Sequence, residues 1–251
     1  MTLSKASSNF MKETIPEAFF EAADKYGSKT ALLQKKSGVY FPITYKELKE
    51  KVKIFSKILS GLGIKKGEAV AILSENRPEW VISDLATMSL GAVVVPCHTT
   101  FNQAVILNIL NHSEAKIIIV SCRDFLNKVL LVEKNLKFLK KIIFLGKATP
   151  DLQEILKEKL ISWETLFENQ LPENQKTSQP ANRTTSPDDI CSIIYTSGTT
   201  GTPKGVMISH RNFLSNVRAV NKAVPVKTSD IFLSFMPLSH VLERMAGYYT
   251  P

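Results

Sequence analysis

An alternation of short apolar segments with amphipathic segments constrains the fold of this chain most strongly. Apolar runs typical of buried strands lie at residues 69–73, 93–95, 116–120 and 141–145. The segments between them have the apolar spacing of helices and lie at residues 78–90, 102–111 and 123–138. Because a helix that links two such strands returns the chain to the start of the sheet, the pattern predicts an α/β fold: a mostly parallel sheet flanked by helices on both faces.

Boundary signals support the predicted helices. Thr44 can act as an N-cap, and Glu47 three residues later completes a capping box. The apolar residues that follow fall on one helix face: Leu48, Val52, Phe55, Leu59 and Leu62. Ser74 or Asn76 can cap the next helix, where Pro78 suits the first turn because a missing N–H costs nothing there.

The composition is that of a soluble globular protein, with 44% hydrophobic residues and a formal charge of 32 − 23 = +9. The lysines are scattered among acids, which favours a solvated basic surface over one that attracts polyanions. No recognisable nucleic-acid-binding module is present, so no nucleic-acid partner is expected. The first ten residues lack the apolar core of a signal peptide, and the apolar runs are too short to span a bilayer. We therefore expect a cytoplasmic protein.

The three cysteines, Cys97, Cys122 and Cys191, lie far apart and form no CxxC pair. Their spacing argues against a disulfide framework and against a zinc site. A further change of composition occurs at residues 169–187, which are rich in Asn, Gln, Thr and Ser and contain three prolines. This composition predicts a linker or an exposed loop.

Residues 196–205 combine three glycines, five hydroxyl side chains and one lysine between two strand-like runs, residues 190–195 and 206–209. Glycines let backbone N–H groups approach a ligand closely, and hydroxyls donate short hydrogen bonds. Lys204 adds a mobile cation that can follow phosphate oxygens. The combination indicates a phosphate-binding loop.

Two other interpretations of this loop were weighed. A Walker A motif requires Gly-Lys followed by Ser or Thr at the start of a helix, whereas here Lys204 follows Pro203 and leads into a strand. A Gly/Thr-rich hairpin turn without a ligand is the simpler alternative. The added Pro-Lys-Gly and the density of hydrogen-bond donors favour the phosphate site over that turn.

Residues 195–206, YTSGTTGTPKGV, resemble the signature loop of the AMP-binding, adenylate-forming superfamily. That family includes acyl-CoA synthetases, the adenylation domains of peptide synthetases and beetle luciferases. Further segments agree with the family in the same order, at residues 14–19, 43–48, 74–80 and 90–96. Its members join a carboxylic acid to AMP with release of pyrophosphate, and most then transfer the acyl group to a thiol. The resemblance implies the N-terminal part of the adenylate-forming ligase fold.

For the loop, the resemblance implies a clamp on the β- and γ-phosphates of ATP. The nucleotide-binding positions that match the family are Thr196, Ser197, Gly198, Thr199, Thr200, Gly201, Thr202 and Lys204. Preorganised donors and a cation there would stabilise the charge that spreads onto the departing pyrophosphate. The loop is expected to position and neutralise phosphates rather than to act as a base or nucleophile.

A second segment, PLSHVLER at residues 237–244, looks most like long-chain acyl-CoA synthetases. In the family, a His or aromatic residue at the position of His240 lines the acyl-substrate pocket. The alternative is that His240 only caps or packs at a helix start, with Glu243 as its i+3 neighbour. Its register with the loop favours the pocket role. No second His stands at ligand spacing, so no metal site is expected at His240.

The resemblance thus implies a long-chain-fatty-acid–CoA ligase that uses fatty acid, ATP and coenzyme A, with Mg²⁺ as cofactor. Within the same chemistry, a medium-chain, aryl or carrier-protein-loading ligase is the alternative. A truncated, non-catalytic nucleotide- or lipid-binding remnant is an alternative of a different class. Peripheral membrane association suits an enzyme of insoluble fatty acids, while the oligomeric state cannot be derived from the sequence.

In the family, the adenine-, ribose- and magnesium-binding residues, the hinge and the catalytic lysine lie downstream of the segments matched here. We therefore expect an incomplete ligase that has no catalytic residue of its own and is inactive alone. The expected organisation is an N-terminal α/β subdomain at residues 1–168, a linker or exposed loop at residues 169–187, and the start of a second α/β subdomain, carrying the phosphate-binding loop, at residues 188–251.

Overall fold

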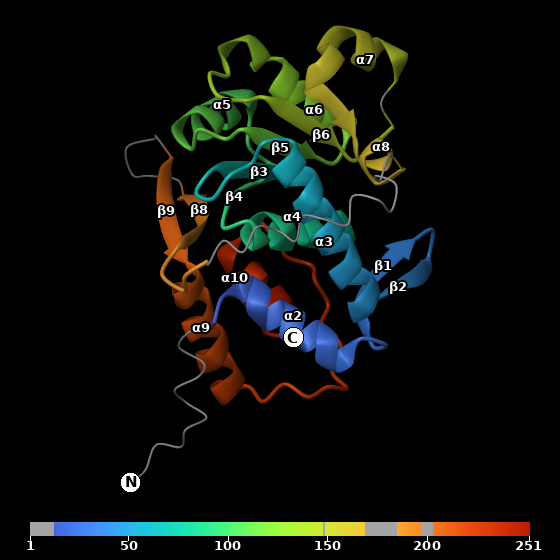
Figure 1. Ribbon diagram of the computed structural model, residues 1–251, viewed down its shortest axis with the longest axis vertical. Helices are drawn as coiled ribbons and strands as arrows, with labels where there is room; N and C mark the ends of the chain where they lie inside the picture. Colours follow the sequence, from blue (N-terminus) through green and yellow to red (C-terminus); the bar gives the residue numbers. More distant parts are fainter. Residues whose placement is uncertain (1–12, 148, 169–184, 197–202) are drawn as a thin grey trace.

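A computed structural model describes residues 13–147, 149–168, 185–196 and 203–251, and it is built around a seven-stranded sheet (Figure 1). The strands of this sheet stand in the order β7-β6-β5-β3-β4-β8-β9. Their bounds are β3 Ala69–Leu73, β4 Val93–Cys97, β5 Ile117–Val120, β6 Lys141–Phe144, β7 Leu160–Ser162, β8 Ile190–Thr196 and β9 Lys204–Ser209. The predicted α/β class with a mainly parallel sheet is confirmed.

Every neighbouring pair in the sheet is parallel except β8 and β9, which form an antiparallel hairpin at one edge. Strand β8 joins the sheet beside β4, where Ser192 pairs with Val94. Strands from both sides of residues 169–187 therefore belong to one sheet. The division of the chain into two subdomains stays a prediction.

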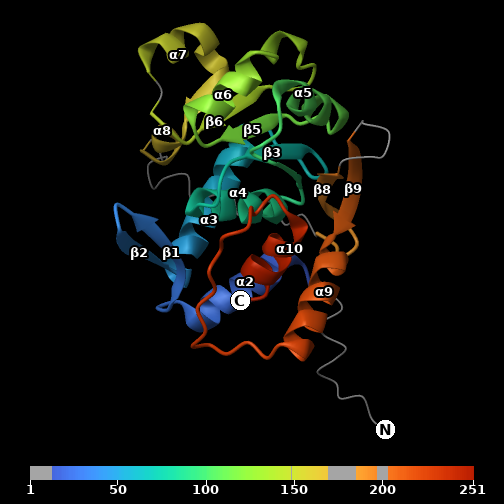
Figure 2. The same cartoon turned by 180° about the vertical axis from the view of Figure 1, so that it is seen from behind.

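Helices cover both faces of the sheet, as Figures 1 and 2 show from opposite sides. Their bounds are α2 Ile15–Tyr26, α3 Tyr45–Gly61, α4 Pro78–Ser89, α5 Gln103–His112, α6 Arg123–Leu130, α7 Pro150–Leu156, α8 Trp163–Glu168, α9 His210–Ala223 and α10 Val241–Glu243. The chain continues from α10 into a π-helical turn, η4, at Arg244–Tyr249. Within the described residues, no helix is both long and apolar enough to cross a membrane.

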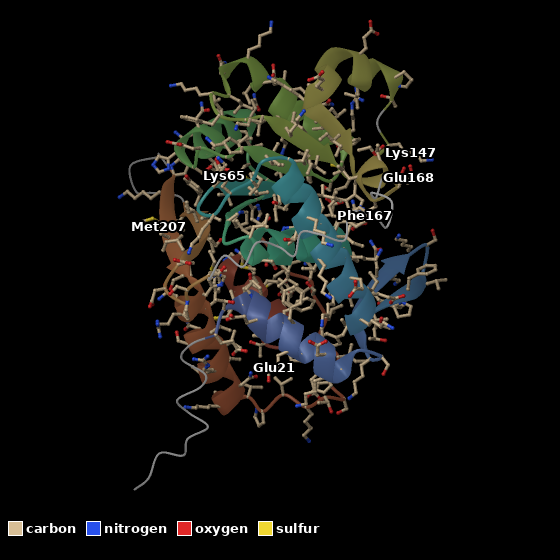
Figure 3. The ribbon with its side chains drawn as sticks, viewed as in Figure 1. Glu21, Lys65, Lys147, Phe167, Glu168 and Met207 are labelled. Carbon is tan, nitrogen blue, oxygen red and sulfur yellow. The ribbon has the colours of Figure 1, made fainter. Side chains whose placement is uncertain are left out.

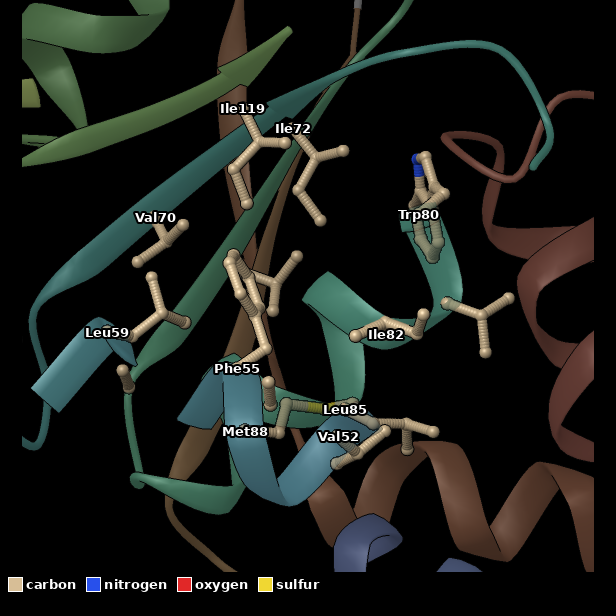
Figure 4. Packing of buried hydrophobic residues seen from close by; sticks show 14 of the residues in the cluster. Val52, Phe55, Leu59, Val70, Ile72, Trp80, Ile82, Leu85, Met88 and Ile119 are labelled. Carbon is tan, nitrogen blue, oxygen red and sulfur yellow. The ribbon is translucent and has the colours of Figure 1, made fainter. Parts of the chain in front are cut away.

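The parallel strands are buried on both faces, and alternate side chains feed two apolar cores. Val70 and Ile72 of β3 point into the core beneath α2, α3, α4 and α9, whereas Ala71 and Leu73 point into the core beneath α5, α6 and α7. Figure 4 shows the first of these cores, where Phe55 lies among side chains of α4 and β3. The expected stripe of α3 is confirmed, since its apolar residues fill this core.

The boundaries of the predicted helices agree in part. Thr44 caps α3 and accepts a hydrogen bond from the Glu47 N–H at 3.2 Å, while the Glu47 carboxylate accepts from the Thr44 N–H at 2.7 Å. The predicted cap of α4 is wrong, because its N-cap is Arg77 and makes no side-chain capping bond.

The helix predicted at residues 123–138 is also shorter than expected. Helix α6 ends at Leu130, and a short 3₁₀ turn, Glu133–Asn135, follows. Each flanking strand has four residues and spans about 13 Å, which an eight-residue helix matches at about 12 Å. A sixteen-residue helix would extend about 24 Å and overshoot the start of β6.

Some elements carry no signal that was recognised in the sequence. They are the β1–β2 hairpin, Thr30–Lys36 and Val39–Thr44, and the segment that forms α7, β7 and α8. The hairpin turns at Ser37 and Gly38, which both have positive φ (48° and 84°), as a two-residue turn between twisted strands requires. The three cysteines are free thiols: Cys97 and Cys191 are buried and Cys122 is half-buried.

Candidate functional site

The predicted phosphate-binding loop connects the two strands of the β8–β9 hairpin. The strands pair from Ile190 and Ser209 at the base to Thr196 and Lys204, which face each other at the tip. Six of the predicted nucleotide-binding positions lie outside the described residues: Ser197, Gly198, Thr199, Thr200, Gly201 and Thr202. The structure therefore describes the two ends of the loop. Both predicted flanking strands are present, but β8 extends one residue further than predicted, to Thr196, and β9 begins two residues earlier, at Lys204.

The hairpin tip lies at the end of the sheet formed by the carboxyl ends of the parallel strands. Strand β8 runs parallel to β4, and β4 runs parallel to β3 and β5. Thr196, the last residue of β8, therefore lies at the same end of the sheet as the carboxyl ends of these three strands. Crevices at these carboxyl ends are the usual binding sites of open parallel sheets. The Lys204 side chain is exposed, and it forms no salt bridge with the described part of the chain. It is thus available to a phosphate.

Tyr195, the first residue of the motif, anchors the hairpin to α5. Its hydroxyl lies 2.7 Å from His112 Nδ1, and the two rings meet edge to face with centroids 5.7 Å apart. Burial raises the pKa of Tyr195 to about 12, so the hydroxyl keeps its proton at neutral pH. Its ring also lies over Gly205, where an added Cβ would stand 3.2 Å from Tyr195 Cζ and 2.8 Å from Ile193 Cγ2. The last glycine of the motif is therefore needed for strand packing.

His240 lies at the start of α10. It is the N-cap of that helix, and its Nδ1 accepts a hydrogen bond from the Leu242 N–H at 3.3 Å. The ring is exposed to solvent. The capping role weighed in the sequence analysis is therefore present, and the substrate role of His240 stays a prediction.

The segment before His240 is fixed by Asn76, a residue expected to cap α4. The Asn76 side-chain oxygen accepts from the Leu238 N–H at 2.8 Å, and its amide nitrogen donates to the Met236 carbonyl at 2.7 Å and the Ser234 hydroxyl at 2.9 Å. These partners lie about 160 residues further along the chain. The Asn76 side chain thus forms its hydrogen bonds with the segment that leads into His240, and not with the start of α4.

The segment after His240 is fixed by Arg244, which is fully buried. Its guanidinium donates to the Tyr249 hydroxyl and to the Ser192 hydroxyl, each at 2.7 Å, and to the Asp84 carboxylate. The Tyr249 hydroxyl in turn donates to Asp84 Oδ2 at 2.7 Å. Burial raises the pKa of Asp84, and Arg244 and the Tyr249 hydroxyl oppose that shift. We call Asp84, Ser192, Arg244 and Tyr249 the buried arginine network.

The sequence analysis did not identify this network. One signal was available, because Asp84 stands alone as an acid within the central turns of the otherwise mostly apolar helix α4. Such a residue is almost never fully buried unless it is paired. What could not be derived from the sequence is its partner, 160 residues away.

His210 is the second buried polar residue that joins distant segments. It is the first residue of α9, and its Nδ1 accepts a hydrogen bond from the Ile15 N–H at 3.3 Å. Burial lowers the pKa of His210 to about 4, although Asp189 opposes the shift. The imidazole is therefore neutral at pH 7 and has a structural role.

The geometry agrees with the comparison to known proteins, in which a family model for AMP-binding enzymes matches residues 19–251. The chain belongs to the AMP-binding enzyme family. A curated relative, a chloroplastic long-chain-fatty-acid–[acyl-carrier-protein] ligase of Arabidopsis thaliana, is 32% identical over 94% of this chain and 34% of its own length. A long-chain-fatty-acid–CoA ligase of Xenopus laevis is 33% identical over 92% of this chain and 31% of its own length. The chain thus spans about a third of the length of these relatives.

Solved structures of the family share the fold. The anthranilate CoA ligase AuaEII, in complex with anthranoyl-AMP, superposes with a TM-score of 0.84 at 24% identity and covers 99% of this chain and 45% of its own. The A-PCP didomain of a carboxylic acid reductase from Segniliparus rugosus, in complex with AMP, has a TM-score of 0.79 at 20% identity and covers 95% of this chain and 38% of its own. At such identities the likeness establishes the adenylate-forming fold alone.

Proposed function

We propose that the protein carrying this chain activates a long-chain fatty acid with ATP to acyl-AMP and then transfers the acyl group to coenzyme A. The observation that carries the proposal is the β8–β9 hairpin of this AMP-binding family member, which holds Thr196 opposite Lys204 at the ends of the signature loop. The fatty-acid substrate is supported by two relatives at 32% and 33% identity, whose names specify long-chain fatty acids.

In this proposal the loop acts by binding and neutralising phosphates. The exposed Lys204 ammonium contacts the β- and γ-phosphates of ATP, and the Thr196 hydroxyl donates to a phosphate oxygen from the facing strand. Both groups stabilise the negative charge that moves onto pyrophosphate when the carboxylate attacks the α-phosphate. The described residues contain no cluster of three or more His, Cys, Asp or Glu suited to a metal, so we assign no step to Mg²⁺ through them.

Two alternatives remain within the same chemistry, each with its own observation. Anthranilate CoA ligase has the same fold, which favours testing aryl acids. The Arabidopsis relative is named for an acyl-carrier-protein acceptor, which favours testing that thiol beside coenzyme A. A non-catalytic nucleotide- or lipid-binding remnant is the alternative of another class, and it predicts ligand binding without turnover.

The test is acid-dependent exchange of labelled pyrophosphate into ATP by the full-length polypeptide that the gene encodes. Palmitate, octanoate and anthranilate serve as acids, and coenzyme A or acyl carrier protein then serves as acceptor. We expect palmitate to support the fastest exchange and Lys204→Ala to reduce it by about 10- to 100-fold. The matched control is Lys57→Ala, which removes an exposed lysine from α3 and should leave exchange unchanged.

Each outcome separates the alternatives. Exchange with anthranilate but not palmitate would replace the fatty acid by an aryl substrate. Binding of labelled ATP without exchange on any of the acids would favour the non-catalytic remnant. Equal exchange rates for the wild type and Lys204→Ala would contradict the phosphate role of the loop. For the isolated 251-residue chain, we expect no formation of AMP from ATP and fatty acid.

A further inference from the structure

The buried arginine network connects the two predicted site segments to each other. Arg244 lies one helical turn after His240, and its N–H donates to the His240 carbonyl at 3.1 Å. The same residue donates through its guanidinium to Ser192, four residues before Thr196 on β8. One side chain thus contacts the strand that leads into the phosphate-binding loop and belongs to the turn that carries His240.

Aromatic rings surround the guanidinium and tie it to two more helices. Its central carbon lies 5.5 Å from the ring centroid of Trp80 on α4, 5.2 Å from that of Phe213 on α9 and 5.5 Å from that of Tyr249. Helix α9 directly follows β9, so Arg244 contacts both strand β8 of the phosphate-binding hairpin and the helix that follows the hairpin. Figure 2 shows α10 beside α9 and α4, near the base of the hairpin.

The His240 turn is consequently held at both ends. Asn76 fixes the Leu238 N–H before it, and Arg244 fixes the helix after it. Asn76 lies just before α4, and Arg244 binds Asp84 of α4. Helix α4 packs directly on the central strand β3 of the sheet. The exposed His240 ring is thereby presented on a turn with little freedom to move.

Stability alone does not require an arginine at this position. Taking a charge pair out of water is costly, and well-packed apolar residues of similar volume often serve as well or better. A fully hydrogen-bonded guanidinium instead fixes the geometry of its partners, because its donors form a rigid planar fork. The network therefore specifies an arrangement of β8, α4 and the His240 turn.

We propose that Arg244, together with Asp84 and Tyr249, is a positioning residue that sets the placement of the His240 turn relative to the phosphate-binding hairpin. The inference rests on the proposed function, since it takes His240 as the acyl-pocket residue and the hairpin as the ATP site. Arg244 itself is fully buried, so it acts through Ser192 and through the helix that His240 begins.

The test is the double variant Asp84→Leu/Arg244→Met in the full-length polypeptide, which replaces both charged side chains by apolar ones. We expect its melting temperature to stay within about 3 °C of the wild type, while kcat for acid-dependent pyrophosphate exchange falls by about 10-fold or more. The matched control is Asp188→Leu/Arg211→Met, which removes the bidentate but exposed pair between Arg211 and Asp188. It should leave kcat unchanged.

A double-mutant cycle distinguishes positioning from a merely structural role. If Arg244 acts through His240, the combined variant should have a kcat less than about 2-fold lower than that of His240→Ala alone. The inference would be overturned if Asp84→Leu/Arg244→Met lowered kcat by the same factor in the wild type and in His240→Ala. An unchanged kcat in the folded double variant would also overturn it. If the double variant loses its fold, Tyr249→Phe removes only the bridging hydroxyl, and an unchanged kcat there would likewise overturn it.

A readout without catalysis keeps this inference distinct from the proposed function. In the 251-residue chain, the amides of residues 242 and 244 both donate to His240, and their hydrogen exchange should accelerate by about 10-fold in Asp84→Leu/Arg244→Met and not in the exposed control. Unchanged protection would contradict the positioning role even if the ligase activity is confirmed. Conversely, if the wild-type full-length polypeptide exchanges no pyrophosphate with any of the acids, the proposed function is overturned. Faster hydrogen exchange in Asp84→Leu/Arg244→Met would even then show that Arg244 holds the His240 turn in place.

Discussion

Asp84 and Arg244 form an ion pair in which both side chains are fully buried, although 160 residues separate them in the chain. Asp84 belongs to α4, near the middle of the sheet, and Arg244 belongs to the last helical turn of the chain. A buried ion pair has a net free energy near zero relative to apolar residues, but the loss of one partner leaves an uncompensated charge. The pair therefore couples the folding of these two segments.

The first prediction concerns the removal of one partner. Asp84→Ala should lower the free energy of unfolding by about 3–5 kcal/mol, because the Arg244 charge stays buried without its carboxylate. Asp188→Ala, which removes the exposed partner of Arg211, should change the free energy of unfolding much less, because solvent screens that pair. Urea unfolding of both variants measures the difference. Equal losses would show that Arg244 finds water or another partner when Asp84 is absent.

The second prediction concerns the dependence of stability on pH. The pKa of His210 is lowered to about 4 in the folded chain, against 6.5 for an exposed histidine, so the unfolded state binds a proton that the folded state excludes. This contribution to stability is complete above pH 6.5 and is lost as the pH falls towards 4. Between pH 7 and pH 5 the free energy of unfolding should fall by about 2 kcal/mol from this residue.

His210→Gln separates this contribution from those of other titrating groups. Glutamine offers a side-chain oxygen to the Ile15 N–H but does not titrate. The variant should therefore lose about 2 kcal/mol less than the wild type between pH 7 and pH 5, in urea unfolding at the two pH values. The wild type measured at the same two pH values is the control. Parallel curves for the wild type and His210→Gln would contradict a neutral buried imidazole.

The third prediction concerns the last glycine of the loop motif. A Cβ on Gly205 would stand 2.8 Å from Ile193 Cγ2, so Gly205→Ala should destabilise the hairpin by about 1–3 kcal/mol through overpacking. Gly61→Ala is the control, because nothing lies within 4 Å of its added Cβ and it ends helix α3. That variant should be neutral or stabilising by up to about 1 kcal/mol. Thermal unfolding of the two variants measures both effects.

Much of the fold could be predicted because its signals are local. The strand Ala69–Leu73 is a continuous apolar run, and the capping box at Thr44 and Glu47 lies within four residues. The early end of α6 was not predictable from the sequence around it, because the length of the neighbouring strands sets it. The role of Asn76 was not predictable for a similar reason. Its side chain suits a helix cap, but in the structure it is hydrogen-bonded to a distant backbone segment instead.

The candidate site divides in the same way. The loop motif and its flanking strands were predicted, since ten consecutive residues carry the chemistry. The anchor of Tyr195 on His112 and the contact of Arg244 with Ser192 join residues 83 and 52 positions apart. Such contacts depend on the order of strands in the sheet, which the sequence pattern leaves open. The sequence therefore identifies the loop, and only the structure shows how it is held.

The last prediction concerns an exposed apolar segment between α9 and α10. Ile231, Leu233 and Phe235 are 82%, 77% and 77% exposed, whereas Ser234 is held by Asn76 at 2.9 Å. Phe232 is 42% exposed as well, so the run of residues 231–235 presents several apolar side chains to solvent, and it belongs to none of the described helices or strands. The outer face of the edge strand β9 adds Met207, which is 66% exposed and projects from the molecule in Figure 3. We expect the isolated 251-residue chain to self-associate through the segment of Ile231, Leu233 and Phe235.

Ile231→Ser/Leu233→Ser should therefore slow the aggregation of the 251-residue chain, measured by light scattering at 37 °C, without changing its free energy of unfolding by more than about 0.5 kcal/mol. The control is Leu131→Ser, which removes one leucine that is 73% exposed at the C-terminal end of α6. Because single exposed apolar residues are common on stable proteins, this control should leave the aggregation rate unchanged. Equal aggregation rates for the wild type and the double variant would show that self-association uses another surface, with Met207 on β9 as the next residue to replace.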